Sequence, residues 1–417
     1  MSVGTERDHR MLVYGGFALS LAVVIGVCRP WNLADHFMVG APFGRDFVNF
    51  WTAGRLALDG RLDLLVDFPG YNALIAERFH HSADDFFVFS YPPGLLAFLV
   101  PFGALPYLPA LLLWTAINLA LLAWTTRQIA GDRWPVIATC LSPATVTMVT
   151  YGHFGGVLAM LATLALTRAA ARPALAGACL ALISVKPQLA VTLGLLMLLI
   201  GQWRAVAWSL PGAAALIGLS VVAFGLSPWT NFFNVTVPFH SWLIGDFVPD
   251  HLRTMLSLYA AGRLWGLSFA AAQALQLGFG LAVIAASAML VRRDGLNSRT
   301  QALLLLAAIT ALAYFQHYDL AIATPALAVA LFAPAGDDAR PVLSFVPASL
   351  IWLAPPIAIP FGIYHWPLIN LVVAGVLVIG LIEAWRAGAR TDLRAREPHE
   401  PGEVDDVQLQ PATANRS

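Results

Sequence analysis

The chain has 417 residues, of which 59% are hydrophobic and only 12% are charged, and its formal net charge at pH 7 is zero. Soluble proteins carry about 25% charged residues, whereas a bilayer-spanning helix needs roughly 20 apolar residues. Four long stretches contain no Asp, Glu, Lys or Arg: 134–167, 205–245, 264–291 and 341–382. This pattern excludes a soluble globular protein and indicates an all-α polytopic membrane protein, with no basic arm that would suggest a nucleic-acid partner.

Apolar runs separated by Pro, Gly and charged residues predict about twelve membrane spans. In chain order they are 11–29, 107–127, 134–150, 154–169, 173–186, 188–202, 204–225, 268–292, 300–316, 319–334, 341–357 and 366–386. The apolar segment 94–104 is expected to be a re-entrant or in-plane element. The segment 11–386 is then the membrane domain, residues 1–10 precede it, and the polar tail 387–417 is expected to be disordered.

The arginines orient these spans. With a cytoplasmic N-terminus, 16 of the 23 arginines fall in cytoplasmic loops and termini, as the positive-inside rule requires. The same topology sends the chemically versatile residues to the outer face, including a long first outer loop at 30–93. Transport paths are usually built from two repeated halves, and the sequence contains no internal repeat. We therefore expect a multi-pass protein of the inner membrane with its site on the outer side and both termini in the cytoplasm.

The first outer loop contains the first candidate for chemistry. From Phe47 to Leu58 the apolar residues Phe47, Phe50, Trp51, Leu56 and Leu58 recur at helical spacing, which predicts an interfacial amphipathic helix facing lipid, and a second such helix follows at about 71–80. Asp46 immediately precedes the first helix. It can serve as the N-cap, or it can act as a general base that accepts a proton from a hydroxyl group. Arg45 beside it is expected to keep the carboxylate ionised.

Lys186 is the only lysine in the chain, and it precedes Pro187 between two apolar runs. Proline breaks the helix there, and an ammonium group at membrane depth is costly unless carbonyls or an anion meet it. The side chain either snorkels to the interface or binds an anion, and a lipid-linked phosphate is the obvious anion.

The run from Gln316 to Asp319 interrupts two charge-free segments. His and Asp residues at membrane depth are functional or paired with each other, so a structural His317–Asp319 pair is the alternative to a substrate site. His153 is a further candidate, although the glycines around it can also serve close helix packing.

The outer loop 226–267 holds a group of polar residues: His240, Asp246, Asp250, His251 and Arg253. This grouping could ligate a divalent metal, but its spacing matches no strong metal-site template, and we expect no metal and no cofactor. Arg253 is a candidate second contact to a phosphate.

Seven short motifs resemble those of the polytopic GT-C glycosyltransferases of family 87. They are DFVNFWxAGRLALDG from Asp46, YPP from Tyr91, WTAIN from Trp114, SP at Ser142, YGH at Tyr151, KPQ at Lys186 and HYDL at His317. They occur in the family's order, and the resemblance covers roughly residues 10–385. One departure is a Gly-Gln-x-Asn pattern of the family, which reads Gly152-His153-Phe154-Gly155 here. The resemblance therefore leaves the transferred sugar open between mannose, arabinofuranose and others.

The resemblance implies an inverting transfer of a sugar from a polyprenyl-phosphate donor to a glycan or glycolipid acceptor, with Asp46 as the base. Lys186, with Arg253 or Arg45, would then stabilise the leaving phosphate. The substrate-binding candidates come from the same motifs: Asn49, Tyr91, His153, Gln188, His317, Tyr318 and Asp319. A transporter or flippase of lipid-linked sugars is the main alternative, and a non-catalytic membrane scaffold is a third.

Overall fold

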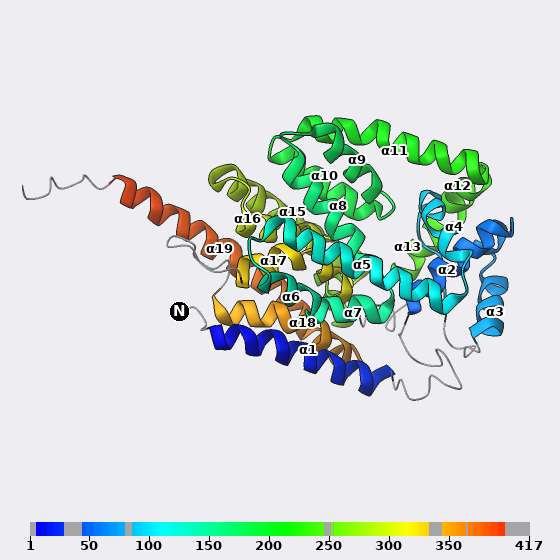
Figure 1. The fold of residues 1–417 in the computed structure, drawn as a ribbon, viewed down its shortest axis with the longest axis horizontal. Helices are drawn as coiled ribbons and strands as arrows, with labels where there is room; N and C mark the ends of the chain where they lie inside the picture. Colours follow the sequence, from blue (N-terminus) through cyan, green and yellow to red (C-terminus); the bar gives the residue numbers. More distant parts are fainter. Residues whose placement is uncertain are drawn as a thin grey trace, which may run out of the picture.

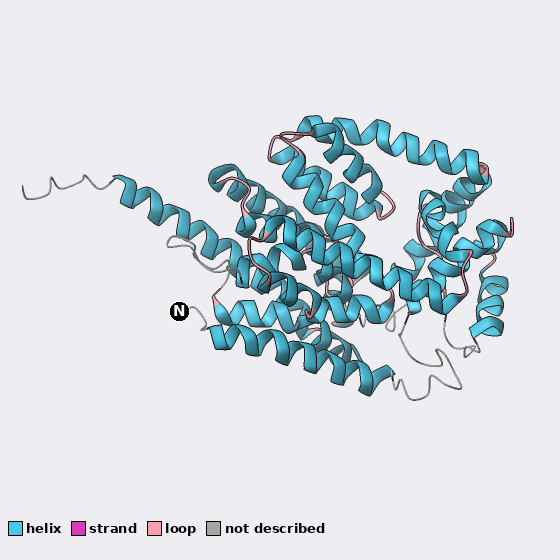
Figure 2. Cartoon of the chain, in the orientation of Figure 1, coloured by secondary structure: helices cyan, strands magenta, loops and turns pink. Residues whose placement is uncertain are grey.

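The computed structural model describes residues 6–28, 44–79, 86–245, 252, 254–332, 344–363 and 366–396. Every regular element in these ranges is helical, and no strand occurs among them (Figure 2). The α-helices are α1 (Glu6–Cys28), α2 (Arg45–Leu58), α3 (Phe68–Phe79), α4 (Leu96–Gly103), α5 (Tyr107–Ile129), α6 (Trp134–Cys140), α7 (Pro143–Tyr151), α8 (Gly155–Arg168), α9 (Pro173–Ile183), α10 (Pro187–Leu199), α11 (Trp203–Phe224), α12 (Ser227–Asn231), α13 (Val237–Gly245), α14 (Leu258–Leu264), α15 (Phe269–Asp294), α16 (Ser298–Thr310), α17 (Thr324–Phe332), α18 (Phe345–Ile363) and α19 (Leu368–Arg396). The all-α class is as expected.

Long helices define the long axis of the molecule. Figure 1 shows α1, α5 and α11 running along it, while α2, α3 and α4 gather at one end, on the right of the view. Five helices in the described residues are long and apolar enough to cross a bilayer: Glu6–Gly26 of α1, α5, α11, α15, and Leu368–Ala387 of α19. These helices support a membrane protein.

The prediction of about twelve spans is not confirmed. Most of the other apolar runs form helices that are too short to cross a bilayer alone, since roughly 20 residues are needed. The segment 134–150 is divided at Ser142 and Pro143 into α6 and α7. The run 319–334 begins as a 3₁₀ turn, η6 (His317–Ile322), before α17 starts. The segment 94–104, which was not counted among the twelve spans, contains the end of a 3₁₀ turn, η3 (Pro93–Leu95), and the eight-residue α4. Because α16 and α17 are almost entirely buried by protein, their apolar surfaces need no contact with lipid.

The apolar face of α2 packs on protein, so the expectation that it faces lipid is wrong for Phe47, Phe50, Trp51 and Leu56, which are buried; only Leu58 is exposed. The reason is a close crossing of α2 with α4. A Cβ added at Gly54 would lie 2.3 Å from the carbonyl oxygen of Leu99, so the two backbones touch. The apolar residues of α3 are buried in the same way: Tyr71, Ile75 and Phe79.

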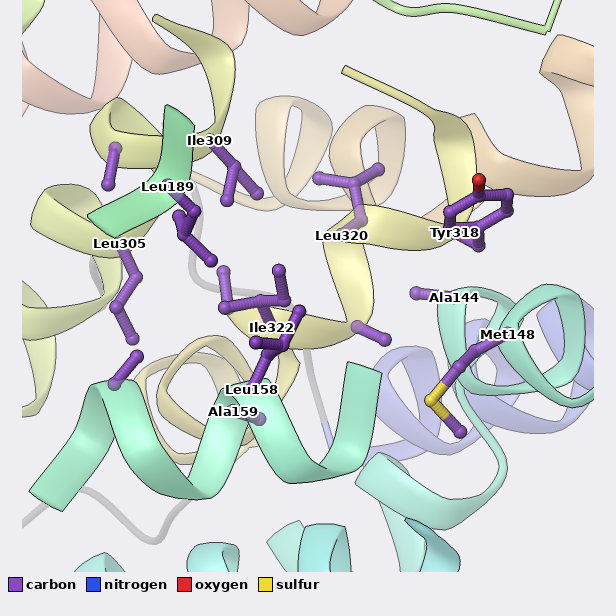
Figure 3. Close-up of a cluster of buried hydrophobic side chains, with 14 of the residues drawn as sticks. Ala144, Met148, Leu158, Ala159, Leu189, Leu305, Ile309, Tyr318, Leu320 and Ile322 are labelled. Atoms are coloured by element: carbon purple, nitrogen blue, oxygen red, sulfur yellow. The ribbon is translucent and has the colours of Figure 1, made fainter. Parts of the chain in front are cut away.

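The turn η6 rests on an apolar core formed by several helices. Figure 3 shows Leu320 and Ile322 among side chains of α8, α10 and α16, while Tyr318 lies beside α7. The labelled neighbours are Leu158, Ala159, Leu189, Leu305 and Ile309 around the first two, and Ala144 and Met148 near Tyr318. Because Leu320 and Ile322 are packed in this core, the positions of the polar residues in the same turn, His317 and Asp319, are fixed as well.

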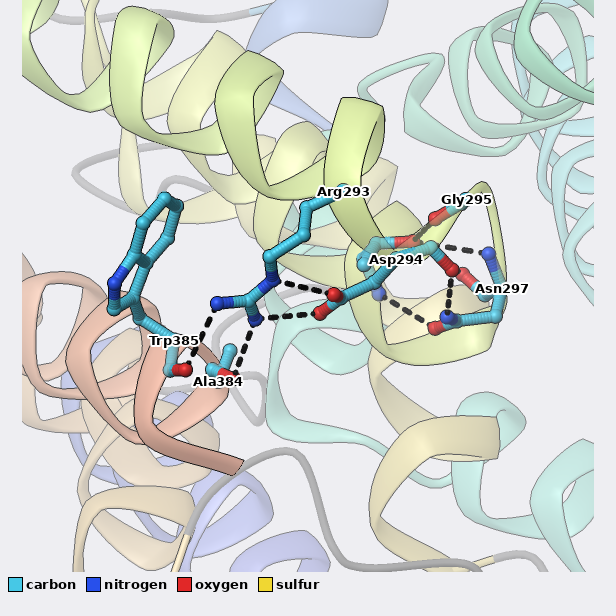
Figure 4. A network of polar contacts seen from close by, with 7 residues as sticks. Arg293, Asp294, Gly295, Asn297, Ala384 and Trp385 are labelled. Atoms are coloured by element: carbon cyan, nitrogen blue, oxygen red, sulfur yellow. Dashed lines mark hydrogen bonds and ion pairs between the residues drawn. The ribbon is translucent and has the colours of Figure 1, made fainter. Parts of the chain in front are cut away.

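The turn between α15 and α16 is held by a polar network (Figure 4). Arg293 binds Asp294 and donates to the carbonyl oxygens of Ala384 and Trp385 in α19, at 3.1 and 2.9 Å. Asn297 and Thr300 cap the start of α16 reciprocally. This network joins α15 to α19, which continues to Arg396 and thus into the segment expected to be a polar tail. Residues 397–417 lie outside the described residues.

Candidate active site

Asp46 lies in the first turn of α2 and is not its N-cap. That position belongs to Gly44, which has φ 69° and whose carbonyl oxygen accepts from Val48. Gly44 also donates its backbone N–H to Thr150 at the end of α7, at 2.5 Å. The start of α2 is therefore tied to α7, and the Asp46 carboxyl is not used to cap the helix.

The turn between α7 and α8 supports the start of α2. Gly152 ends α7 with φ 70°, and a Cβ there would lie 2.6 Å from the Cβ of Phe47. Only glycine suits both the left-handed backbone and this contact. The indole N–H of Trp114 in α5 donates to the Gly152 carbonyl oxygen at 3.0 Å. Trp114 and Phe47 thus hold the turn between α5 and α2.

Asn118, one turn further along α5, fixes the beginning of α8. Its side-chain oxygen accepts the backbone N–H groups of Gly156 and Val157 at 3.1 and 3.2 Å. These are first-turn donors that have no partner within their own helix. The WTAIN motif therefore serves to anchor the turn that carries His153.

Burial raises the pKa of Asp46 to about 6. A side-chain hydrogen bond with Tyr318 and the charges of Arg45 and Lys186 lower it, and Asp319 raises it further. The expectation that Arg45 keeps the carboxylate ionised is thus only partly right, because desolvation outweighs the neighbouring positive charges. The Oδ2 atom of Asp46 is buried and has no hydrogen-bond partner within the described part of the chain.

Lys186 is buried and pairs with Asp319, whose carboxylate also accepts the backbone N–H of Gln316 at 3.1 Å. The lysine side chain is 3% exposed and that of Asp319 is 0% exposed. Lys186 therefore does not snorkel to the interface. The structural alternative of a His317–Asp319 pair is also wrong, because Asp319 binds the ammonium group and His317 Nδ1 instead lies 3.1 Å from the carbonyl oxygen of Thr254.

Two buried histidines flank Tyr318. His153 is 1% exposed and stacks between Phe154 and Tyr318, with ring centroids 4.6 and 4.5 Å away. His317 is 0% exposed, and its ring lies 5.3 Å from that of Tyr318. Burial lowers the pKa of His153 well below its usual range, with a smaller effect from Lys186, and it lowers the pKa of His317 to about 4. Both imidazoles are therefore neutral at pH 7.

Three tyrosines lie close enough to Asp46 for its charge to affect them. Burial raises the pKa of Tyr91, Tyr314 and Tyr318, and the negative charges of Asp46 and Asp319 raise all three further. Tyr314 is absent from the residues that the sequence singled out. Its position three residues before His317 was the available signal, because that spacing keeps it close to the same short polar run.

The structure thus brings Asp46, Tyr91, His153, Lys186, His317, Tyr318 and Asp319 into one cluster. Arg45 lies at its edge, where it donates to the carbonyl oxygen of Phe86 at 3.0 Å and lies 4.6 Å from the ring of Phe87.

Two candidates form no side-chain hydrogen bond or ion pair with this cluster among the described residues. Asn49 accepts a hydrogen bond from Tyr71 at 3.2 Å, and Gln188 is half-buried at the start of α10. Arg253, Asp246, Asp250 and His251 lie outside the described residues, whereas His240 contacts the ring of Tyr314 at 5.1 Å. Within the described ranges, no group of three His, Cys, Asp or Glu side chains could hold a metal ion.

The comparisons with known proteins point to one family. A family model described as glycosyltransferase family 87 matches residues 89–316, which is more than half of the chain. The matched region includes Tyr91, His153 and Lys186. His317 is the first residue after it, whereas Asp46 lies 43 residues before its start. No curated protein and no solved structure matches the chain.

Proposed function

Since the chain belongs to glycosyltransferase family 87, we propose that it transfers one sugar from a polyprenyl-phosphate donor to a glycan or glycolipid acceptor. The apolar helices support a membrane enzyme that meets lipid-linked substrates. We further propose that the reaction takes place on the outer face of the inner membrane, where the arginine distribution would put the first loop.

One observation carries this proposal: the environment of Asp46. Its carboxyl lies outside the five candidate spans, is desolvated, has one buried oxygen with no partner among the described residues and has a pKa raised to about 6. A general base is most effective when its pKa lies near the working pH, because it is then both ionised and basic. An ordinary surface carboxylate would be a weaker base.

In the proposed reaction an acceptor hydroxyl attacks the anomeric carbon of the donor sugar in line with the bond that breaks. The new bond joins the acceptor oxygen to that carbon, and the bond from the carbon to the phosphate oxygen breaks. The proton of the hydroxyl moves to the carboxylate of Asp46, and the polyprenyl phosphate leaves with the electron pair. Attack from the opposite side inverts the configuration, and a phosphate leaving group needs no general acid.

The negative charge that develops on the phosphate needs nearby positive charge. Lys186 has Asp319 as its counter-ion, so a donor phosphate would compete with a buried carboxylate for the same ammonium group. We therefore propose that Arg45, which precedes Asp46 at the edge of the cluster, is the first contact for the phosphate. Lys186 would not bind the phosphate directly, and its positive charge would instead lower the pKa of Asp46.

The decisive test is product analysis with the purified full-length protein in lipid nanodiscs. Polyprenyl-phosphate mannose and polyprenyl-phosphate arabinofuranose are supplied with glycolipid acceptors, and a new glycosidic bond is sought by mass spectrometry. Asp46→Asn should lower turnover by about 10²- to 10⁴-fold. The matched control is Asp59→Asn, because Asp59 lies at the other end of α2, where it is exposed and pairs with Arg55 at 3.2 Å.

Two results would contradict the proposal. Full turnover in Asp46→Asn would remove Asp46 from the role of base. Movement of the lipid-linked sugar across the bilayer without a new glycosidic bond would instead favour a transporter, for which the family match offers no support.

A further inference from the structure

Several buried polar atoms around Tyr318 have no hydrogen-bond partner among the described residues. They are both ring nitrogens of His153, Nε2 of His317 and Oδ2 of Asp46. Buried polar groups in folded proteins nearly always have a partner, since leaving one unpaired costs about 1–3 kcal/mol. A group of them at one place therefore calls for a ligand or ordered water.

These atoms belong to side chains that come from three separate segments but share one neighbour. Tyr318 stacks on His153 with an interplanar angle of 27°, lies 5.3 Å from the ring of His317 and interacts with the side chain of Asp46. His153 is carried by the turn that Trp114 and Asn118 hold in place. The arrangement is built by the fold and does not depend on flexible surface side chains.

The chemistry of these atoms suits hydroxyl groups. A neutral imidazole has one N–H donor and one nitrogen acceptor, and a carboxylate oxygen is an acceptor. A hydroxyl group can donate and accept at once, so a polyhydroxylated ring can satisfy atoms of both kinds. An anion can only accept hydrogen bonds, so it would leave the imidazole acceptors and the carboxylate oxygen unsatisfied.

We propose that His153 and His317 form a subsite around Tyr318 for the hydroxyl groups of the transferred sugar, beside the Asp46 carboxyl that receives the acceptor proton, with His153 as the residue that selects the sugar. This inference rests on the proposed function and specifies the sugar-binding part of that site. The lipid phosphate lies outside the subsite, towards Arg45. His153 is then a binding residue, whereas Trp114 and Asn118 are positioning residues.

The substitution His153→Phe tests this directly. Phenylalanine keeps an aromatic ring between Phe154 and Tyr318 but removes both nitrogens. If His153 is only a core residue, the change is neutral or stabilising, because an unpaired buried polar group is replaced by an apolar one of similar shape. If His153 binds sugar, the protein stays folded and loses affinity for the sugar alone.

The measurement is the difference in Kd between each polyprenyl-phosphate sugar and bare polyprenyl phosphate, using the full-length protein in nanodiscs. The sugars are mannose, glucose, galactose and arabinofuranose. Wild-type protein should bind at least one sugar-bearing lipid more tightly than the bare lipid. In His153→Phe the ratio of the Kd of the bare lipid to the Kd of the sugar-bearing lipid should fall by about three- to tenfold, as expected for the loss of one or two neutral hydrogen bonds. The Kd of the bare lipid itself should not change. His153→Gln, which can still donate and accept, should retain part of the gain.

A matched control is Trp352→Phe in α18, where the indole packs against Phe332 at 4.9 Å. This change also removes a buried ring nitrogen that has no partner within the described ranges. It should leave the sugar-dependent gain unchanged. The inference fails if wild-type protein shows no gain with any of the four sugars, or if His153→Phe keeps the full gain. If the protein binds the sugar-bearing lipid more tightly than the bare lipid but transfers no sugar, the proposed function is wrong and the proposed subsite is still supported.

Discussion

Two polar turns flank α16, and they differ in what surrounds them. Before α16, Arg293 and Asp294 form an ion pair whose side chains are 24% and 25% exposed, and the arginine also binds carbonyl oxygens of α19 (Figure 4). After α16, Lys186 and Asp319 form a pair whose side chains are 3% and 0% exposed. Water can solvate the first pair, whereas only protein surrounds the second.

The same kind of local hydrogen bond, from a backbone N–H to a side chain, fixes the backbone of both turns. The backbone N–H of Asn297 donates to the hydroxyl of Thr300 at 2.9 Å, and that of Gln316 donates to the carboxylate of Asp319 at 3.1 Å. In each case a side chain three residues along satisfies a donor at the start of a helix. Local chemistry therefore shapes both turns, and burial decides that the second can hold reactive and unpaired groups. The following predictions test that distinction.

The largest effect is expected for Lys186. The substitution Lys186→Met leaves the carboxylate of Asp319 buried without its counter-ion, which should cost about 3–5 kcal/mol of unfolding free energy. At the exposed turn, Arg293→Met removes an exposed ion pair and two hydrogen bonds to carbonyl oxygens of α19, and it should cost about 1–2 kcal/mol, still less than Lys186→Met. Thermal unfolding of the two variants in detergent, followed by tryptophan fluorescence, measures the difference.

A double variant isolates the role of charge. Lys186→Met with Asp319→Asn removes both charges and keeps an acceptor for the backbone N–H of Gln316. It should regain most of the stability lost in the single variant, because a buried pair contributes little net free energy once desolvation is counted. A double variant as unstable as Lys186→Met would show that the loss comes from packing and not from the unpaired carboxylate.

The next largest effect concerns two asparagines that accept first-turn backbone N–H groups. Asn118 is 1% exposed and satisfies two donors of α8, whereas Asn297 is exposed and caps α16 locally. Asn118→Ala should cost about 2 kcal/mol because water cannot replace it, and Asn297→Ala about 1 kcal/mol or less. The midpoints of thermal unfolding of Asn118→Ala and Asn297→Ala, each compared with wild type, measure this difference.

Because Asn118 positions the turn of His153, its loss should also raise KM for the donor more than it lowers kcat. Equal effects of Asn118→Ala and Asn297→Ala on the kinetics would contradict this positioning role.

A smaller effect, of about tenfold per pH unit, is expected from the titration of Asp46. As a base it must be ionised, so kcat/KM should fall tenfold per unit as the pH drops below about 6. Stability should change in the opposite sense. The folded-state pKa lies above the ordinary value of 3.8, so protonation favours the folded state, and this contribution is lost as the pH rises through about 6.

The variant Asp46→Asn cannot ionise and should therefore gain stability over wild type as the pH rises from about 4 to 7. Parallel melting curves of the two proteins over this range check the sign. A constant difference in melting temperature would show that Asp46 titrates at its ordinary pKa.

The boundaries of some helices were predictable because they depend on local composition, although other expected spans, such as 134–150, are divided in the structure. The expected segments 107–127 and 204–225 agree closely with α5 and α11, whose ends are marked by Pro, Gly and charged residues. Whether a helix faces lipid or protein was not predictable in the same way. The burial of Phe47 depends on the contact of Gly54 with α4, some 50 residues away along the chain, and no local pattern reveals that contact.

The candidate site shows the same division. Asp46 was identified by its position at the start of an amphipathic helix and by the family resemblance. Residue type and membrane depth were enough to single out Lys186, His153 and Asp319, because each is unusual in an apolar sequence. Their partners were not predictable, since Lys186 and Asp319 are 133 positions apart in the chain. The direction of the Asp46 pKa was missed for the same reason: adjacency to Arg45 is visible in the sequence, whereas desolvation depends on the packed fold.

The smallest effect is expected at the exposed turn. Asp294→Asn removes the charge that Arg293 contacts at 2.6 and 2.8 Å, but Arg293 keeps its bonds to the carbonyl oxygens of Ala384 and Trp385. The unfolding free energy should therefore change by about 0.5 kcal/mol or less at physiological ionic strength, and any change should shrink further as salt is added. Asp319→Asn, measured in the same salt series, should show a larger loss that salt does not alter, because a buried pair is shielded from mobile ions. If Asp294→Asn instead destabilised the protein as strongly as Asp319→Asn, burial would not be what distinguishes the two turns, and the joint between α15 and α19 would itself depend on that charge.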